Sequence, residues 1–231
     1  MMPALRLATY NIHKFVGLDG IWNADRVTGV VRALGADVIA IQEFTIDESR
    51  SGAPSAQEFA RATGHDVIEQ KMQRRNGQIQ FNLLLSRIPL RRREILALHV
   101  AGVEERGAVL VETDTTTPFR IVATHLGLTV DARSRQFETM LAALGAGAPL
   151  PLAVIGDMNL FLPMDPLRLR LRREFPGMSA PATFPSLLPL LALDRILVRP
   201  ASLLQSLQTF AGSGARLASD HLPLVADIAL S

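Results

Sequence analysis

The sequence predicts an α/β protein in which two mixed, mostly antiparallel β-sheets pack face to face with helices on the outside. Strand-like runs outnumber helical segments, and five of the runs follow one another without an intervening helix. Consecutive strands without crossover helices pair antiparallel, and the helices are too few to cover a single parallel sheet. Since the chain has 231 residues, we expect one domain over residues 1–231.

Hydrophobic periodicity locates the individual elements. Strand patterns cover residues 5–11, 37–43, 66–72, 78–86, 93–101, 107–114, 119–126, 151–157, 193–198, 203–210 and 222–230. Helical patterns follow Asn23 up to Gly35 and cover residues 55–62, 131–144 and 165 to about 175. Ser55 and Glu58 have the spacing of a capping box, and Asp165 precedes a proline at the first helical position.

The composition excludes several classes of function. The chain has no cysteine, which removes a disulfide scaffold, a thiol nucleophile and any Cys-ligated metal. A metal would have to be held by carboxylates, amides and the five histidines, which favours a hard cation such as Mg²⁺ or Mn²⁺. The net charge of +2 lacks the basic excess that is typical of duplex-binding proteins.

The first residues lead directly into a predicted strand without the pattern of a signal peptide. No apolar run approaches the roughly 18 residues that are needed to span a bilayer. We therefore expect a cytoplasmic protein without a transmembrane segment, and no feature of the sequence indicates an obligate protein partner.

Polar side chains recur at the ends of the predicted strands. They are Asn11, Glu43, Asn82, His125, Asp157, Asn159, Asp194, Asp220 and His221. One such residue is most often a turn former, and a buried carboxylate is costly unless it is paired or lies at a rim. Their repetition predicts that they converge on one acidic pocket with two histidines. Such a pocket suits a divalent cation and general acid–base chemistry.

The segments around these residues resemble the motifs of the endonuclease/exonuclease/phosphatase superfamily, the DNase I-like phosphohydrolases. In this chain they read Thr9-Tyr10-Asn11-Ile12, Ile41-Gln42-Glu43, Asn82-Leu83-Leu84-Leu85-Ser86-Arg87, Thr124-His125-Leu126, Gly156-Asp157-Met158-Asn159, Leu193-Asp194-Arg195-Ile196 and Ser219-Asp220-His221. They occur in the family's order and extend over almost the whole chain. The resemblance implies a four-layer α/β sandwich, in agreement with the elements predicted above.

The resemblance implies a metal site and a base. Glu43 matches the main metal carboxylate of the family, and Asn11 and Asp220 match positions in the same metal environment. His221 resembles the general base, and Asp194 resembles the carboxylate that orients its ring. The implied cofactor is Mg²⁺ or Mn²⁺.

The resemblance also implies the groups that act on water and phosphate. Asp157 and Asn159 resemble the pair that orients the attacking water and holds a phosphoryl oxygen. His125 matches the second acid or phosphate-binding position, for which the sequence shows no carboxylate partner, and a structural histidine is the alternative. Asn82 matches a phosphate-side amide, although it could equally bridge backbone groups.

Further cationic residues lie near the motifs. Lys14 follows Asn11 closely and could contact a substrate phosphate, with a solvated loop as the alternative. Arg106 precedes a strand where some relatives place a substrate-contacting arginine. Arg133 begins the helix after His125, near the expected anion site. Arg195 stands where the family commonly has an aromatic residue.

Two apolar segments, residues 160–164 and 184–191, end or begin at the expected pocket. Base rates favour a core position for both, whereas exposure would give a surface suited to a lipid phosphodiester. The expected function is a divalent-metal-dependent hydrolase that cleaves a phosphodiester or phosphomonoester by in-line attack of water. The substrate would be a nucleic acid, or a phospholipid or other small phosphodiester. The alternative is a binding module that keeps the fold without activity.

Overall fold

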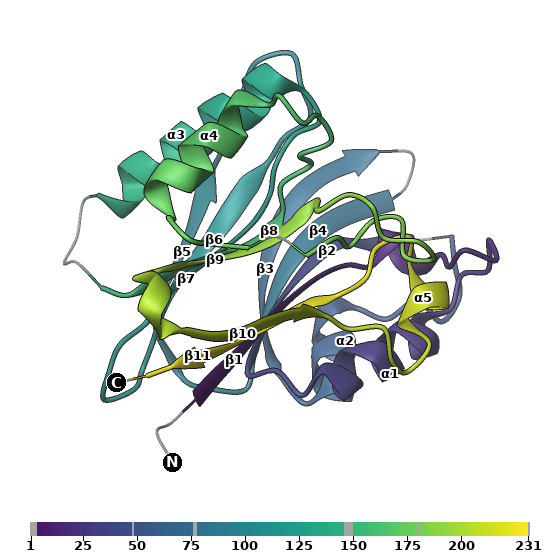
Figure 1. Cartoon of the computed structure of the whole chain (residues 1–231). Coiled ribbons are helices and arrows are strands. Elements are labelled where there is room, and N and C mark those ends of the chain that lie inside the picture. Colours follow the sequence, from purple (N-terminus) through teal and green to yellow (C-terminus); the bar gives the residue numbers. More distant parts are fainter. Residues whose placement is uncertain (1–3, 48, 76–77, 146–149, 180, 231) are drawn as a thin grey trace.

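The computed structural model describes residues 4–47, 49–75, 78–145, 150–179 and 181–230. Two β-sheets pack face to face, as Figure 1 shows. The six-stranded sheet has the order β10-β11-β1-β2-β4-β3, and the five-stranded sheet has the order β5-β6-β7-β8-β9. The strands are β1 (Ala4–Asn11), β2 (Val38–Asp47), β3 (Asp66–Arg75), β4 (Gln78–Ser86), β5 (Leu90–Ala97), β6 (Gly107–Thr113), β7 (Arg120–His125), β8 (Leu152–Asp157), β9 (Asp194–Arg199), β10 (Leu204–Thr209) and β11 (Leu224–Ala229).

Helices cover the outer faces of both sheets (Figure 1). The α-helices are α1 (Ala24–Leu34), α2 (Ala56–Thr63), α3 (Val130–Leu144), α4 (Pro166–Glu174) and α5 (Ala215–Ala218), and short 3-10 turns span His13–Phe15 and Ala201–Leu203. α1 and α2 lie against the six-stranded sheet, while α3 and α4 lie against the five-stranded sheet. The predicted sandwich of two mixed sheets flanked by helices is therefore confirmed. None of the described helices has both the length and the apolar composition to cross a membrane.

The local signals at the helix ends are present in the structure. The Asn23 side chain accepts a hydrogen bond from the backbone N–H of Arg26 at the start of α1. Ser55 and Glu58 form the capping box of α2. Asp165 caps α4 by accepting a hydrogen bond from the backbone N–H of Leu167.

Most strand pairs are antiparallel. The exceptions among the named strands are the parallel pairs β1/β2 and β7/β8, whose connections contain α1 and α3. A parallel pair needs such a crossover, because the chain must return to the same end of the sheet. The mixed, mostly antiparallel sheets follow directly from where the sequence places its helices.

Period-two alternation divides the apolar side chains among three cores. On β1, Leu5 and Leu7 face the other sheet, while Ala8 and Tyr10 face α1 and α2. On β7, Ile121 packs between the sheets. The central strands are therefore buried on both faces, which explains their nearly continuous hydrophobic runs.

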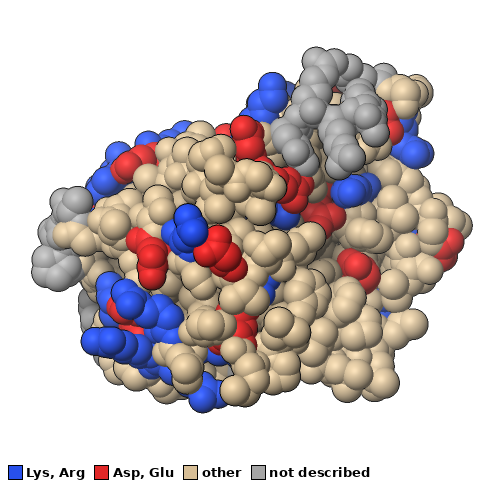
Figure 2. Space-filling view, turned by 90° about the horizontal axis from the view of Figure 1, so that it is seen from above, with Lys and Arg blue, Asp and Glu red and all other residues tan. Residues whose placement is uncertain are grey.

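Charged side chains on the face in Figure 2 form small groups of mixed sign. No continuous basic band crosses the described part of that face. This arrangement agrees with 24 basic and 22 acidic residues spread along the chain. The electrostatic footprint expected for a duplex-binding protein is a stripe of one sign, which this face lacks.

Candidate active site

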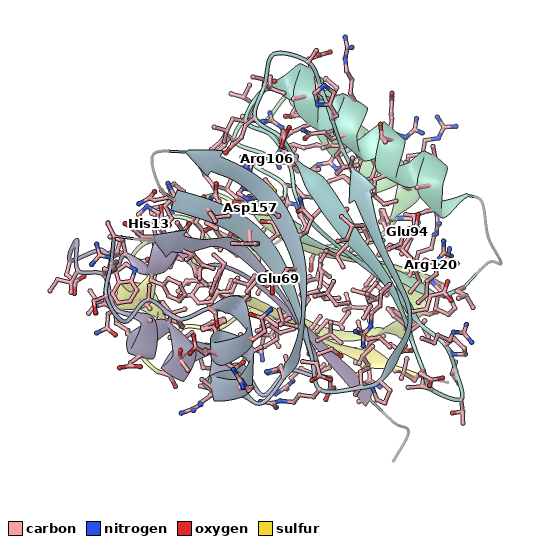
Figure 3. All side chains as sticks on the ribbon, turned by 180° about the vertical axis from the view of Figure 1, so that it is seen from behind. His13, Glu69, Glu94, Arg106, Arg120 and Asp157 are labelled. Atoms are coloured by element: carbon pink, nitrogen blue, oxygen red, sulfur yellow. The ribbon has the colours of Figure 1, made fainter. Side chains whose placement is uncertain are left out.

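The alternation that builds the core between the sheets also builds a polar cluster at one end of it. Asn11, His125, Asp157 and Asp194 continue the inward-facing apolar rows of β1, β7, β8 and β9. On adjacent strands, His125 pairs in register with Asp157, and Asp157 pairs with Asp194. A cleft of about 320 Å³ opens at this end, and Figure 3 shows Asp157, Arg106 and His13 there.

Glu43 reaches the cleft through an irregularity in β2. The register between β2 and β4 shifts between Ile41 and Phe44, which gives β2 one extra residue. Glu43 lies within this bulge with a φ of 59°, in the left-handed region. A bulge re-aims a side chain that regular alternation would direct elsewhere. The carboxylate of Glu43 consequently lies beside Asn11.

Asn11 joins two carboxylates from different sheets. Its Nδ2 donates to Glu43 Oε1 at 3.2 Å and to Asp157 Oδ2 at 3.1 Å. Its Oδ1 accepts from the backbone N–H of His13 at 3.0 Å. The amide therefore brings the carboxylates of β2 and β8 within reach of one small ligand.

His221 and Asp194 form a buried ion pair in which His221 Nδ1 lies 2.8 Å from Asp194 Oδ2. The Thr183 hydroxyl donates to the same oxygen at 2.6 Å, while Asp194 Oδ1 has no hydrogen-bond partner among the described residues. The ring of Phe184 packs on the imidazole with centroids 5.0 Å apart. Burial opposes the imidazolium charge, but the charge and hydrogen bond of Asp194 outweigh it and raise the pKa of His221 to about 10.

Asp157 is the central carboxylate of the cluster. Burial and the nearby charge of Asp194 raise the pKa of Asp157 to about 6. Its Oδ2 lies 3.9 Å from His221 Nε2, and its Oδ1 accepts from the backbone N–H of Asn159 at 2.9 Å. The Asn159 side chain donates to the carbonyl of Leu126 at 2.8 Å, which ties the segment after β8 to the segment after β7.

The contacts of His125 fix its tautomer. Arg106 Nη1 lies 3.1 Å from His125 Nδ1, and a guanidinium is a donor only, so Nδ1 must accept. The ring proton is then on Nε2, 3.6 Å from Asp157 Oδ2. Burial, and next the charge of Arg106, lower the pKa of His125 well below its ordinary value. His125 is thus a neutral donor that faces the cleft.

Backbone strain is concentrated at the cleft. Five of the six described non-glycine residues with positive φ are His13, Lys14, Phe15, Glu43 and Asn159. Such conformations cost about 1–3 kcal/mol each and gather at functional sites. Lys14, Glu43 and Asn159 all line the cleft, so the strain coincides with the polar groups.

The donor set fits a hard divalent cation. Asp157, Asp194 and His221 present ligand atoms within 4.8 Å of one another, and this buried group could bind a metal. The closeness of Asp194 to His221 reflects their own hydrogen bond, however. The oxygens of Glu43 and Asp157, which both accept from Asn11 Nδ2 and do not bond to a histidine, offer an alternative position. A cation there would offset the repulsion between the half-buried carboxylate of Glu43 and the buried carboxylate of Asp157.

The structure brings most of the predicted site residues together. The cleft is lined by Asn11, Lys14, Glu43, Arg106, His125, Asp157, Asn159, Asp220 and His221. Asp194 lies behind His221. Asn82 is outside the lining, because its Nδ2 donates to Gln70 Oε1 at 2.8 Å. The sequence did not reveal a carboxylate beside His125; in the structure Asp157 Oδ2 lies 3.6 Å from His125 Nε2.

Sequence reasoning missed two polar residues of the cleft and misplaced one cation. Gln80 and Glu104 line the cleft, and Glu104 forms an ion pair of 2.6 Å with Arg106. The expectation that Arg133 lies near an anion site is wrong. Its side chain is 1% exposed and forms hydrogen bonds with Asp165. The ion pair of Glu104 with Arg106 could have been inferred from the sequence, because the two residues are only two positions apart.

The expectation that both apolar segments are core is wrong for much of their length. Leu162, Met164, Leu187, Leu188 and Leu190 are exposed, with Met164 91% accessible and Leu190 70% accessible. Phe161 of the first segment and Phe184 of the second line the cleft. Arg216 Nη1 holds the second segment by donating to the carbonyls of Ser186 and Leu187. We call these five exposed residues the apolar rim.

Known proteins share this sequence pattern and fold. Residues 8–221 match the model of the Endonuclease/Exonuclease/phosphatase family. The uncharacterized protein YbhP of Escherichia coli K12 is 29% identical, over 98% of this chain and 97% of its own length.

Solved structures agree at lower identity. An endonuclease/exonuclease/phosphatase from Bacteroides vulgatus has a TM-score of 0.78 at 19% identity, covering 99% of this chain and 100% of that one. TDP2 of D. rerio, in complex with a single-strand DNA product, has a TM-score of 0.69 at 15% identity, covering 97% and 98%. The polar cleft at the end of two packed sheets and the match over most of the sequence lead to one conclusion: the chain belongs to the endonuclease/exonuclease/phosphatase family.

Proposed function

We propose that the protein is a Mg²⁺- or Mn²⁺-dependent phosphohydrolase that cleaves a phosphodiester or phosphomonoester by in-line attack of water. The observation that carries this proposal is the His221–Asp194 pair at 2.8 Å, with Asp157 beside it in an acidic cleft. A histidine oriented by a buried carboxylate is suited to remove a proton from water. The same pair argues against an inactive binding module.

The contacts assign a task to each side chain. Asp157 Oδ2 and His221 Nε2, 3.9 Å apart, would hold the attacking water between them. With His221 in its neutral form, which a cation bound beside Asp157 would favour, the water oxygen bonds to phosphorus, one of its protons passes to the free Nε2 of His221, and the bond to the leaving oxygen breaks. His125, as a neutral Nε2–H donor, and Asn159 would hold the phosphoryl oxygens, with Arg106 and Lys14 as nearby positive charges.

Glu43, Asn11 and Asp220 would hold the metal ion, with Asp157 within reach. When bound, the ion supplies positive charge against the phosphoryl oxygens. The side-chain amide of Asn11 directs its nitrogen toward both carboxylates. To bind the ion through its oxygen, this amide would have to rotate by half a turn and give up the hydrogen bond that Oδ1 accepts from the backbone N–H of His13. Asn82, bonded to Gln70, supports the phosphate side only indirectly.

The reaction class is tested with bis-nitrophenyl phosphate in Mg²⁺ or Mn²⁺. We expect hydrolysis that EDTA abolishes, and a loss of about 10²–10⁴-fold in His221→Ala. His99→Ala is the matched control, because His99 is exposed and outside the cleft lining. Equal rates in wild type and His221→Ala would refute the assignment of the base.

For the substrate, the apolar rim favours a phosphodiester at a lipid surface. The exposed leucines and the methionine of the apolar rim lie next to the polar cleft and can enter the interfacial region of a bilayer. Burial of their apolar area there contributes about 25 cal/mol per Å² to the free energy of binding. The near-neutral net charge of +2 is compatible with an uncharged lipid surface. The proposed substrate is a phospholipid or similar small phosphodiester.

The rim is tested by cosedimentation with phosphatidylcholine vesicles. The double variant Leu187→Ser/Leu188→Ser should lose vesicle binding and hydrolysis of vesicle phospholipid but keep hydrolysis of bis-nitrophenyl phosphate. Leu169→Ser is the control, because Leu169 is 70% exposed on α4 and lies outside the cleft lining. Wild-type protein that hydrolyses bis-nitrophenyl phosphate but ignores vesicles would reject the rim and leave the reaction class intact.

A nuclease is the second candidate. Lys14 and Arg106 in the cleft favour it, since they could contact a nucleic-acid phosphate. TDP2, which shares the fold, was crystallised with a single-strand DNA product. Plasmid DNA and abasic oligonucleotides assayed beside the vesicles decide between the two, because the better substrate is cleaved with the higher kcat/KM.

A further inference from the structure

A second pocket lies on the far side of β9 from the cleft. It is a cavity of about 260 Å³ between α4, the segment that follows α4, and β9. Its walls include Leu171, Phe175 and Met178, and its polar groups include Arg168, Arg172 and Arg195. No carboxylate is among its described lining residues. Its size is just below the roughly 300–1,000 Å³ of typical small-ligand sites.

Arg195 is buried in this pocket by the geometry of β9. Side chains alternate along a strand, so Asp194 faces the gap between the sheets and Arg195 faces the layer of α3 and α4, as Leu197 does. Arg195 is 4% exposed, yet it donates no hydrogen bond to any described residue, and its Nη1 is fully buried without a partner. A buried charge without a partner is expensive unless a ligand completes it.

The neighbouring positive charges of Arg168 and Arg172 make the burial of the Arg195 guanidinium more costly. Arg168 donates only to backbone carbonyls, those of Leu160 and Leu162, and Arg172 has no ion pair or hydrogen bond with the described residues. Burial, and next the charge of Arg168, lower the pKa of Arg195 to about 10. At neutral pH the Arg195 guanidinium is still charged, and Arg168 and Arg172 add two further guanidinium groups to a lining of mixed polar and apolar side chains.

We propose that this pocket binds a small amphipathic anion, with its acidic head group on Arg195 and Arg168 and its apolar chain against Leu171 and Phe175. The head group would supply acceptors to the part of the Arg195 guanidinium that lines the pocket, since this side chain donates no hydrogen bond to any described residue. The hydrocarbon side chains in the lining would favour a ligand that carries a hydrocarbon part over a fully hydrated ion. The site is distinct from the cleft, since its lining shares no residue with the cleft lining.

Isothermal titration calorimetry in EDTA tests the proposal on the intact protein. The probes are octanoate and octylphosphonate, which differ in head group and are not hydrolysable, and 1-octanol, which has no charge. We expect saturable binding of at least one anion and binding of 1-octanol at least about tenfold weaker, since a charge-assisted hydrogen bond contributes about 1.5–3 kcal/mol. Carboxylate and phosphonate heads are distinguished by which probe binds more tightly.

Variants locate the site. Arg195→Met and Arg168→Gln should each weaken anion binding at least about tenfold, and the ligand should no longer raise their Tm. Arg173→Gln is the control, because Arg173 is exposed on the same helix and does not line the pocket. His221→Ala should bind as wild type, which separates this site from the proposed hydrolytic one.

Three results would overturn the proposal. They are the absence of saturable binding of both anions to wild type, equal binding of 1-octanol, and unchanged anion binding in both Arg195→Met and Arg168→Gln. If one of these variants fails to fold, the other still provides the test.

Discussion

Two buried ion pairs lie on opposite sides of the five-stranded sheet, and they differ in how completely they are satisfied. Arg133 and Asp165, between α3 and the start of α4, have side chains 1% and 0% exposed. The Arg133 guanidinium also donates to the carbonyls of Gly127 and Leu128, and Asp165 also caps α4. Every group of this pair has a structural partner, so its effect is to fix the helices and the segment after β7.

The His221–Asp194 pair is left incomplete. Asp194 Oδ1 has no partner among the described residues, and Asp157 adds a third titratable group. One side of the pair opens on the cleft through His221. An ion pair whose polar atoms all have protein partners contributes to folding. An ion pair that lacks such partners and lies beside a cleft can instead bind a ligand. This difference can be tested with one substitution in each pair.

The largest effect is expected for Asp194→Asn. The variant keeps the size of the side chain but loses the charge that holds the imidazolium, so hydrolysis of bis-nitrophenyl phosphate should fall about 10²–10⁴-fold. Its free energy of unfolding should fall by less than the roughly 3–5 kcal/mol typical of a broken buried ion pair, because the charge of Asp194 stabilises the imidazolium of His221 but also penalises ionised Asp157. Steady-state kinetics and urea unfolding measure the two quantities. A strongly destabilised variant with normal kcat would reverse the comparison.

Asp165→Asn should show the opposite pattern. Asparagine is also a good N-cap, so the variant isolates the loss of charge beside Arg133. Leaving that guanidinium buried without its carboxylate should cost about 3–5 kcal/mol of unfolding free energy. The kcat of the folded fraction should remain within a few-fold of wild type. Asp131→Asn serves as the control, because Asp131 has an exposed ion pair.

The pH dependence of stability should distinguish the pairs next. The pKa of His221 is raised in the folded state from 6.5 to about 10, so the folded state holds the proton more tightly. In metal-free protein, this stabilisation is fully present below pH 6.5 and is lost as the pH rises toward 10. Urea unfolding at pH 6, 8 and 10 should show a fall that is smaller in His221→Asn. Identical pH profiles would contradict the raised pKa.

The smallest effect is expected for Thr183→Val. The substitution keeps the shape but removes the hydroxyl that donates to Asp194 Oδ2 at 2.6 Å. Because this hydroxyl acts only through Asp194, kcat should fall by about tenfold or less, corresponding to one hydrogen bond. KM should not change. An effect as large as that of Asp194→Asn would mean that Thr183 alone positions the carboxylate.

The sequence predicts the site best where regular geometry determines it. Asn11, His125 and Asp157 follow alternating strands, and a side chain at the next inward position must enter the gap between the sheets. The family motifs supplied the order of the strands, and with it the expectation that these ends meet. Glu43 was identified by its motif, but the bulge that directs its side chain has no signature in the sequence.

The remaining differences have physical reasons. Asn82 lies on a strand opposite Gln70, and a local amide pair forms more readily than a contact across the gap. Arg133 pairs with Asp165, 32 residues away in the sequence, and this pairing depends on how α3 and α4 pack. The segments 160–164 and 184–191 are apolar in either environment, so composition alone could not decide between core and surface.

Gly156 affects the geometry of the site although it has no side chain. It has a φ of 145°, and a Cβ at this position would lie 1.8 Å from the carbonyl oxygen of Thr124 on β7. The main chains of β7 and β8 are therefore locked together one residue before His125 and Asp157. The spacing of those two reactive groups is therefore set by the main chain. Substitutions in the surrounding cleft walls can change substrate selectivity while this spacing stays the same.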